Sequence, residues 1–254
     1  LHTFGVGESW IAQELEGLGE TRPEVRIGFR AKPGEVDIRI SARADTAALA
    51  HERVIAAADD VRDRLGGWVY GHDGQTMAQL AGRSLRSRGL SLSVAESCTG
   101  GLIACQLTSE PASDFFLGGV VAYANAVKKA VLGVSEDTLR GHGAVSAEVA
   151  AEMAEGARRA FDCDVALSVT GIAGPTGASP NKPVGLVHWA VAYADGTVCE
   201  ERIFHGDRNQ VQKQAATAAL DLVRRTIANA NGSRVGEPAP VLAPPSVSLA
   251  EPSG

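Results

Sequence analysis

The sequence has few aromatic residues and no long apolar run. Aromatics make up only 5% of the 254 residues, whereas hydrophobic residues as a whole reach 44%. We therefore expect a core of small aliphatic side chains packed in close α/β layers. No apolar stretch approaches the roughly 20 residues that a membrane-spanning helix needs. The expectation is a cytoplasmic protein with no membrane partner.

Cysteine is scarce, and positive charge is not in excess. The four cysteines are Cys98, Cys105, Cys163 and Cys199, and no two of them form a Cys-x-x-Cys pair. This spacing supports neither a zinc ribbon nor a thioredoxin-type motif, so free thiols in a reducing compartment are expected. The net charge of −6 gives no overall electrostatic case for binding nucleic acid or an acidic membrane.

Hydrophobic patterning predicts a small α+β domain over residues 1–72. The expected elements are a helix at 7–18, a hairpin at 24–29 and 36–40, a helix at 44–65 and a strand at 68–70. The basic residues around the hairpin are interleaved with acids along the chain, and no Gly-x-x-Gly loop joins two helices. Nucleic acid is therefore not expected as a partner.

From residue 73 the pattern changes to alternating helices and strands. This order predicts an α/β fold over 73–231, a three-layer α/β/α sandwich with a mixed, mostly parallel sheet. The expected strands are 91–96, 119–123, 164–169, 184–192 and 198–204, and the expected helices are 75–88, 99–108, 125–128, 146–161 and 207–227. Residues 232–254 are rich in Pro, Ala and Ser and are expected to form a disordered tail.

The clearest chemical signal is the run Glu96-Ser97-Cys98-Thr99-Gly100-Gly101, between a predicted strand and a predicted helix. It places two potential nucleophiles where the backbone N–H groups of a helix start are unpaired. Ser97 needs a base to attack, whereas Cys98 gains reactivity because a helix N-terminus lowers the pKa of a thiol. The residues alone do not choose between the two, and a plain helix cap is a third interpretation.

Two more polar loops, 123–128 and 170–177, also follow predicted strands. Loops at the carboxyl ends of parallel strands meet at one edge of a sheet, where ligands bind. Lys128 is a candidate base if desolvation leaves its amine neutral, although a lone lysine is nearly always a solvated surface charge. His142, between two glycines, is a second candidate base. The N–H groups of the turn at 98–101 are candidate donors to an oxyanion or a phosphate.

Six motifs occur in the order found in the CinA family. They are Ala95–Gly101, Gly118–Asn125, Gly143–Ser146, Thr170–Pro175, Lys182–Gly185 and Gly206–Arg208. Over residues 73–230 the sequence resembles the CinA carboxy-terminal domain, a nicotinamide-nucleotide amidase. Residues 1–72 resemble the small KH-like middle domain of full-length CinA proteins.

The resemblance implies hydrolysis of nicotinamide mononucleotide to nicotinate mononucleotide and ammonia, in pyridine nucleotide salvage. It implies a Ser/Lys acyl-enzyme mechanism with no metal or other cofactor, and a homo-oligomer. Ser97 matches the family nucleophile, Lys128 its base, and Tyr123 a candidate proton donor. The substrate-binding positions that it implies are Glu96, Thr99, Gly100, Gly101, Asn125, Thr170, Gly171, Ala173, Gly174 and Arg208.

The sequence departs from the family pattern at a few positions. Ala124 stands in place of the usual serine of the Tyr-Ser-Asn motif, and Ala126 and Val127 replace its usual Glu-Ala. Ala112 and Ala178 stand where glycine is common. These changes leave Ser97 and Lys128 in place and bear on rate and substrate positioning. The alternative function is a catalytically weak CinA-like protein that binds a nucleotide or a partner.

Overall fold

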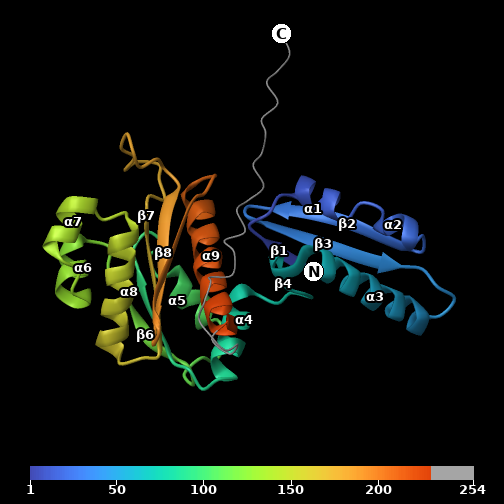
Figure 1. Cartoon of the computed structure of the whole chain (residues 1–254), viewed down its shortest axis with the longest axis horizontal. Helices are drawn as coiled ribbons and strands as arrows, with labels where there is room; N and C mark the ends of the chain where they lie inside the picture. The colour runs from blue at the N-terminus through green and yellow to red at the C-terminus, as the bar shows by residue number, and fades with distance from the viewer. Residues whose placement is uncertain (230–254) are drawn as a thin grey trace, which may run out of the picture. The chain divides into compact units, whose positions relative to one another are not determined.

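The structure, a computed structural model, describes residues 1–229 (Figure 1). The chain divides into two compact units, one from residues 1–73 and one that begins at Gly74. The tail predicted at 232–254 lies outside the described residues. Within residues 1–229, no helix has both the length and the apolar character that crossing a bilayer requires.

Unit 1 is an antiparallel sheet in the order β2-β3-β1-β4, packed against helices. Its elements are β1 (His2–Phe4), α1 (Glu8–Glu14), α2 (Leu18–Thr21), β2 (Val25–Lys32), β3 (Glu35–Ala42), α3 (Ala47–Leu65), the 3₁₀ turn η1 (Gly66–Trp68) and β4 (Val69–Gly71). The predicted α+β fold is confirmed. The helix expected at 7–18 is interrupted because Gly17 adopts a φ of 76°, which separates α1 from α2.

Unit 2 contains a five-stranded sheet in the order β6-β5-β7-β8-β9. The strands are β5 (Leu92–Glu96), β6 (Phe116–Val121), β7 (Val165–Gly171), β8 (Leu186–Tyr193) and β9 (Gly196–Ile203). β5 pairs in parallel with β6 and β7, whereas β8 runs antiparallel to both of its neighbours. All strands except β8 therefore point the same way, as the predicted mixed, mostly parallel sheet requires.

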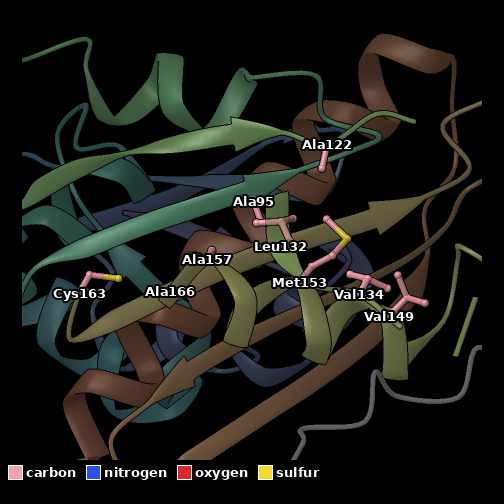
Figure 2. Close-up of a cluster of buried hydrophobic side chains, with 9 residues drawn as sticks. All are labelled: Ala95, Ala122, Leu132, Val134, Val149, Met153, Ala157, Cys163 and Ala166. Atoms are coloured by element: carbon pink, nitrogen blue, oxygen red, sulfur yellow. The ribbon is translucent and has the colours of Figure 1, made fainter. Parts of the chain in front are cut away.

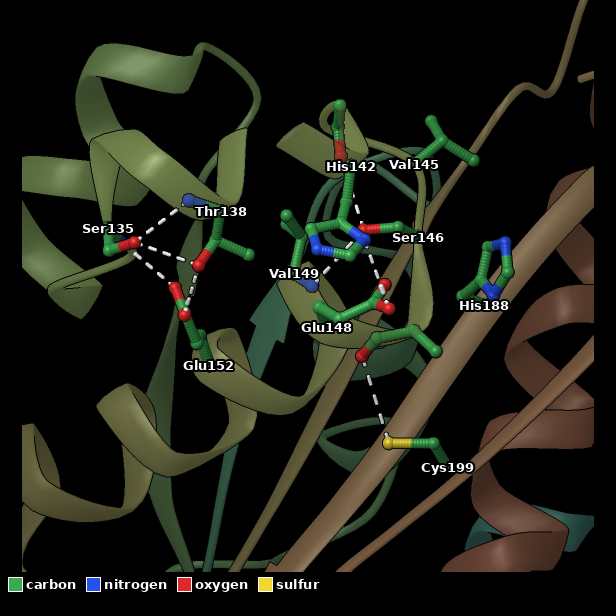
Figure 3. Close-up of polar contacts among 12 residues, drawn as sticks. Ser135, Thr138, His142, Val145, Ser146, Glu148, Val149, Glu152, His188 and Cys199 are labelled. Carbon is green, nitrogen blue, oxygen red and sulfur yellow. Dashed lines mark hydrogen bonds and ion pairs between the residues drawn. The ribbon is translucent and has the colours of Figure 1, made fainter. Parts of the chain in front are cut away.

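Helices cover both faces of this sheet, which confirms the three-layer architecture (Figure 1). They are α4 (Met77–Arg86), α5 (Leu102–Leu107), α6 (Asn125–Leu132), α7 (Glu136–His142), α8 (Ala147–Phe161) and α9 (Arg208–Asn229). α7 is absent from the sequence prediction because it has no buried stripe. It is held instead by Glu152 of α8, which accepts hydrogen bonds from the Ser135 N–H and the Thr138 hydroxyl (Figure 3).

The core between the sheet and α8 reaches the strand ends where the polar loops begin. Figure 2 shows Ala95 of β5 and Ala122, which follows β6, among side chains from α6, α8 and β7. α6 and α8 approach each other closely at Gly156, where an added Cβ would overlap the backbone carbonyl of Leu132. Only glycine permits this approach, which fixes α6 against the rest of the core.

We expect Gly156→Ala to destabilise the protein by about 1–3 kcal/mol, because the methyl group would push α6 away from α8. Gly141→Ala in α7 is the matched control, since nothing lies within 4 Å of its added Cβ. That change should be neutral or stabilising by up to about 1 kcal/mol, as is usual for Gly to Ala within a helix. Urea unfolding of both variants measures the difference, and equal free energies of unfolding would contradict it.

Candidate active site

The three polar loops converge at one edge of the unit 2 sheet. The Ala122 N–H donates to the Glu96 carbonyl at 2.7 Å, and the Ser97 N–H donates to the Val169 carbonyl at 2.9 Å. These bonds continue the parallel ladder just beyond the ends of β6, β5 and β7. The convergence predicted from the sequence is therefore present in the structure.

Ser97 and Lys128 meet at this edge. The Lys128 Nζ lies 3.1 Å from the Ser97 Oγ. It also lies 2.7 Å from the Ala122 carbonyl oxygen and 3.3 Å from the Tyr123 carbonyl oxygen. Lys128 is only 1% exposed and Ser97 is 8% exposed. The alternative interpretation of Lys128 as a solvated surface charge is therefore wrong.

Burial changes the chemistry of the Lys128 amine. Desolvation lowers its pKa from the ordinary value of 10.5, because the charged ammonium loses its water. Among the described residues, no carboxylate forms an ion pair with the Lys128 Nζ. A neutral amine has two N–H donors and one lone pair. It can donate to the two backbone carbonyls and accept the Ser97 O–H.

The Glu96 carboxylate holds the turn that follows β5. It accepts hydrogen bonds from the N–H groups of Gly101, Ile103 and Ala104, at 3.0, 3.1 and 2.8 Å. The Gly100 N–H donates to the Ser97 carbonyl at 3.1 Å. The N–H groups of Gly100 and Gly101 are thus used within the turn, in contrast to the expectation that they face a ligand.

The polar hydrogens beside Ser97 that stay available belong to Cys98 and Thr99. In residues 1–229, the N–H groups of these two residues donate to no oxygen of the protein. The Thr99 hydroxyl is also buried without a hydrogen-bond partner. Unsatisfied buried polar groups are costly and uncommon. Their position beside Ser97 makes them candidate donors to an oxyanion.

Cys98 is poorly suited to be the nucleophile. Burial raises the pKa of its thiol to about 12, and the Glu96 charge contributes to the increase. The expected lowering by a helix N-terminus is outweighed because a thiolate would be desolvated there. The Cys98 carbonyl accepts a hydrogen bond from the Gln212 side chain of α9 at 2.7 Å, so the residue anchors the turn.

Arg208, the first residue of α9, joins two of the predicted loops. Its Nη1 donates to the Gly174 carbonyl at 2.8 Å, and its Nη2 donates to the Tyr123 hydroxyl oxygen at 3.0 Å. Tyr123 is 61% exposed. Because its oxygen accepts from Arg208, its own O–H proton stays free to donate. The structure thus brings Tyr123, Gly174 and Arg208 together.

The other predicted site residues lie at the same edge but make different contacts. The Thr170 hydroxyl donates to the Ala144 carbonyl at 2.7 Å, which ties β7 to the loop before α8. Gly171 packs so tightly on β8 that an added Cβ would lie 2.7 Å from Val187. Ala173 is buried, and Asn125 is exposed at the start of α6.

The sequence prediction of the site omitted Gln212 and Lys182, and the candidate base His142 does not lie beside Ser97. Gln212 carries no local signal, because its partner Cys98 is far away in the chain. Lys182 bridges the β7–β8 loop to the carbonyls of His142 and Val145. The ring of His142 lies 3.1 Å from Glu148, so it pairs with that acid rather than with Ser97 (Figure 3). In residues 1–229, no three His, Cys, Asp or Glu side chains gather to hold a metal ion.

Comparison with known proteins identifies both units. The CinA C-terminal domain family matches residues 74–227, and the damage-inducible protein CinA KH domain family matches residues 1–71. A CinA-like protein from Kosmotoga olearia is 40% identical over 228 residues, which cover 89% of this chain and 55% of that protein. The chain spans about half the length of the curated relatives that it matches.

Solved structures agree with this relationship. The competence/damage inducible protein CihA from Agrobacterium tumefaciens is 38% identical with a TM-score of 0.57, covering 61% of this chain and 97% of that one. A competence-damaged protein (CinA) superfamily protein from Escherichia coli is 35% identical with a TM-score of 0.57, covering 61% and 94%. The chain belongs to the CinA family.

Proposed function

We propose that unit 2 is a Ser/Lys amidohydrolase. Its proposed substrate is nicotinamide mononucleotide, which it converts to nicotinate mononucleotide and ammonia in cytoplasmic pyridine nucleotide salvage. The observation that carries the proposal is the buried Lys128 amine, 3.1 Å from the Ser97 hydroxyl and without a carboxylate partner among residues 1–229. The identity of the substrate comes from the family resemblance of the motifs around these two residues.

The first chemical step uses the neutral form of Lys128, toward which burial shifts the amine by lowering its pKa. The neutral amine takes the Ser97 proton while its two N–H groups stay on the carbonyls of Ala122 and Tyr123. The Ser97 oxygen attacks the carboxamide carbon, and negative charge develops on the amide oxygen. The N–H groups of Cys98 and Thr99 stabilise that charge, which is usually a large part of catalysis in acyl transfer.

The second step releases ammonia. The tetrahedral intermediate collapses when the leaving nitrogen receives a proton, either directly from the Lys128 ammonium or from the Tyr123 O–H, whose phenolate then recovers a proton that the Lys128 ammonium gives up through solvent; either way Lys128 is neutral again. The Ser97 ester then remains, and a water molecule attacks it after losing a proton to neutral Lys128. Cleavage of the ester returns that proton to Ser97 and releases the carboxylate product. Arg208 is the proposed partner of the substrate phosphate, because a guanidinium suits phosphate oxygens.

One observation favours the weaker alternative. α6, which carries Lys128, begins at Asn125, and the residue in the N-cap position before it, Ala124, offers no side-chain cap. Serine, the usual residue of the family motif, would supply one and typically stabilises a helix end by about 1 kcal/mol. Looser placement of Lys128 would slow proton transfer without removing it. The second candidate function is therefore a catalytically weak nucleotide-binding protein.

The central test measures ammonia release from nicotinamide mononucleotide, its riboside and free nicotinamide. The proposal predicts turnover of the mononucleotide above the other two, and loss of that turnover in Ser97→Ala. Cys98→Ser, the matched control, should keep most of the activity because the thiol is not ionised. Full activity in Ser97→Ala would exclude the assigned nucleophile. Binding of the mononucleotide without ammonia release would favour the alternative function.

Lys128→Met keeps the length of the side chain and removes the base. We expect kcat to fall about 10²–10⁴-fold, the usual contribution of a general base. The folded protein should be equally stable or more stable at neutral pH. This follows because folding then no longer disfavours an ammonium that is charged in the unfolded chain below its ordinary pKa of 10.5. A large loss of stability would instead indicate a structural role.

The pH dependence of the wild-type enzyme tests the same group. Only the neutral amine accepts the Ser97 proton, so kcat/KM should rise with pH through the pKa of Lys128 in the free enzyme. Because burial lowers that pKa, the midpoint should lie below 10.5. The residual activity of Lys128→Met is the control. If that activity rises with pH over the same range as in the wild type, the pH dependence belongs to another group.

Thr99→Val separates substrate contact from structure. The hydroxyl has no hydrogen-bond partner among the described residues, so its removal should leave the melting temperature unchanged or raise it. If the hydroxyl donates to the bound substrate, kcat/KM should fall about 5–10-fold, equivalent to one hydrogen bond of roughly 1 kcal/mol. Thr99→Ser is the control that keeps the hydroxyl. Unchanged kcat/KM in the valine variant would remove Thr99 from the site.

A further inference from the structure

One face of α9 contacts all three polar loops of the candidate site. Its first residue, Arg208, donates to the Gly174 carbonyl and to the Tyr123 hydroxyl oxygen. Gln212 lies four residues later, and positions four apart share one face of a helix. The Gln212 side chain donates to the Cys98 carbonyl at 2.7 Å. Two side chains of one helix thus reach all three loops.

The start of α9 is held by its own hydrogen bonds and by burial. The Asp207 carboxylate accepts from the Gln210 N–H at 2.9 Å, and the Gln210 side chain accepts from the Asp207 N–H at 2.8 Å. This reciprocal pair has the form of a capping box, which stabilises the first turn of a helix. Val211 and Ala215 are fully buried. Gln212 therefore projects from a helix whose first turns are held in place.

The contact at Cys98 fixes the direction of the next N–H group. In a trans peptide, the C=O and the following N–H lie in one plane and point in opposite directions. Among residues 1–229, the cis peptide bond joins Gly174 to Pro175, so the bond between Cys98 and Thr99 is trans. Because Gln212 holds the Cys98 carbonyl, the Thr99 N–H points away from Gln212.

The neighbouring N–H group, that of Cys98, is set by the turn itself. It shares a peptide plane with the Ser97 carbonyl, which accepts from the Gly100 N–H at 3.1 Å. The two candidate oxyanion donors therefore have different supports. The Cys98 N–H depends on a contact within the turn, whereas the Thr99 N–H depends on a side chain 114 residues beyond Cys98.

We propose that Gln212 is a positioning residue, which holds the Cys98–Thr99 peptide so that the Thr99 N–H meets the developing oxyanion. This inference rests on the proposed function, in which Ser97 attacks a carboxamide. Gln212 acts through the peptide and touches no reacting atom. Its contribution is realised only when negative charge develops on the amide oxygen, so it affects kcat rather than substrate binding.

The test compares Gln212→Met with the matched control Gln214→Met. Methionine keeps the length of the side chain and removes its N–H donors. The Gln214 amide donates to the carbonyls of His205 and Gln210 at 2.8 and 3.1 Å, so its loss also removes hydrogen bonds that hold the start of α9. Ammonia release from nicotinamide mononucleotide and from its riboside gives kcat and KM, and the melting temperature of each variant measures stability.

In Gln212→Met, we expect kcat to fall about 10–100-fold for both substrates, because the Thr99 N–H remains but is misdirected. KM should change by less than about twofold, as for an interaction made only in the transition state. The midpoint of the pH profile should stay at the wild-type value, since Lys128 keeps its contacts. Gln212→Lys restores an N–H donor and should recover most of the activity, whereas Gln214→Met should keep the wild-type kcat.

An unchanged kcat in Gln212→Met would overturn the inference. Equal losses of kcat in the two methionine variants would also overturn it, because they would show a general loosening of α9. A loss confined to the mononucleotide would instead make Gln212 a phosphate-recognition residue, which contradicts a role at the carboxamide.

A fluorophosphonate probe separates this inference from the choice of substrate. It forms an O–P bond to a nucleophilic serine with loss of fluoride, and its phosphonyl oxygen needs the same donors as the oxyanion. If the wild type is labelled at Ser97 but releases no ammonia, the proposed substrate is wrong, and the labelling rate of Gln212→Met should still fall about 10–100-fold. Ser97→Ala should take up no label. If the wild type shows neither labelling nor turnover, the proposed nucleophile is wrong and the role of Gln212 is overturned with it.

Discussion

The burial of the Lys128 amine beside Ser97 is the constraint on which the candidate site depends. An ammonium taken out of water is costly unless a counter-charge accompanies it. The structure supplies two backbone carbonyls and one hydroxyl instead of a carboxylate. These oxygens can accept from an ammonium, or two of them can accept from a neutral amine whose lone pair faces the Ser97 proton. Burial lowers the pKa of Lys128 and so shifts it toward the neutral form that a general base needs.

Glu96 shows how the same turn keeps negative charge away from that amine. It is adjacent to Ser97 in the chain, yet its carboxylate is directed to three N–H groups at the start of α5. An acid aimed at Lys128 would hold it as an ammonium and remove its basicity. The acid instead fixes the turn, and the N–H groups of Cys98 and Thr99 are left beside Ser97. One carboxylate thus affects both the proposed base and the proposed oxyanion donors.

Local sequence patterns predicted much of the fold, whereas the arrangement of side chains in the candidate site depends on contacts between residues far apart in the chain. The periodicity of residues 91–108 predicted strand, turn and helix, and the parallel strands brought three loops together as expected. The converging loops made Lys128 one candidate base for Ser97, and the family motifs selected it, because 31 residues separate the two and no local pattern links them. Gln212 lies 114 residues from Cys98 and has no sequence signal. Which N–H groups of the turn remain without a partner depends on the direction of the Glu96 side chain, and the spacing of residues in the sequence does not determine that direction.

The charge of the β2–β3 hairpin illustrates a second limit of linear reasoning. The period of two that predicts the hairpin also sorts its side chains between faces, so net charge along the chain says little about either face. Arg30 of β2 pairs in register with Asp37 of β3, although the two are seven positions apart in the chain. On the helix α3, by contrast, Arg62 pairs with Asp59, three positions earlier. Strand register therefore sets the charged neighbours on the sheet, whereas linear spacing sets them on the helix.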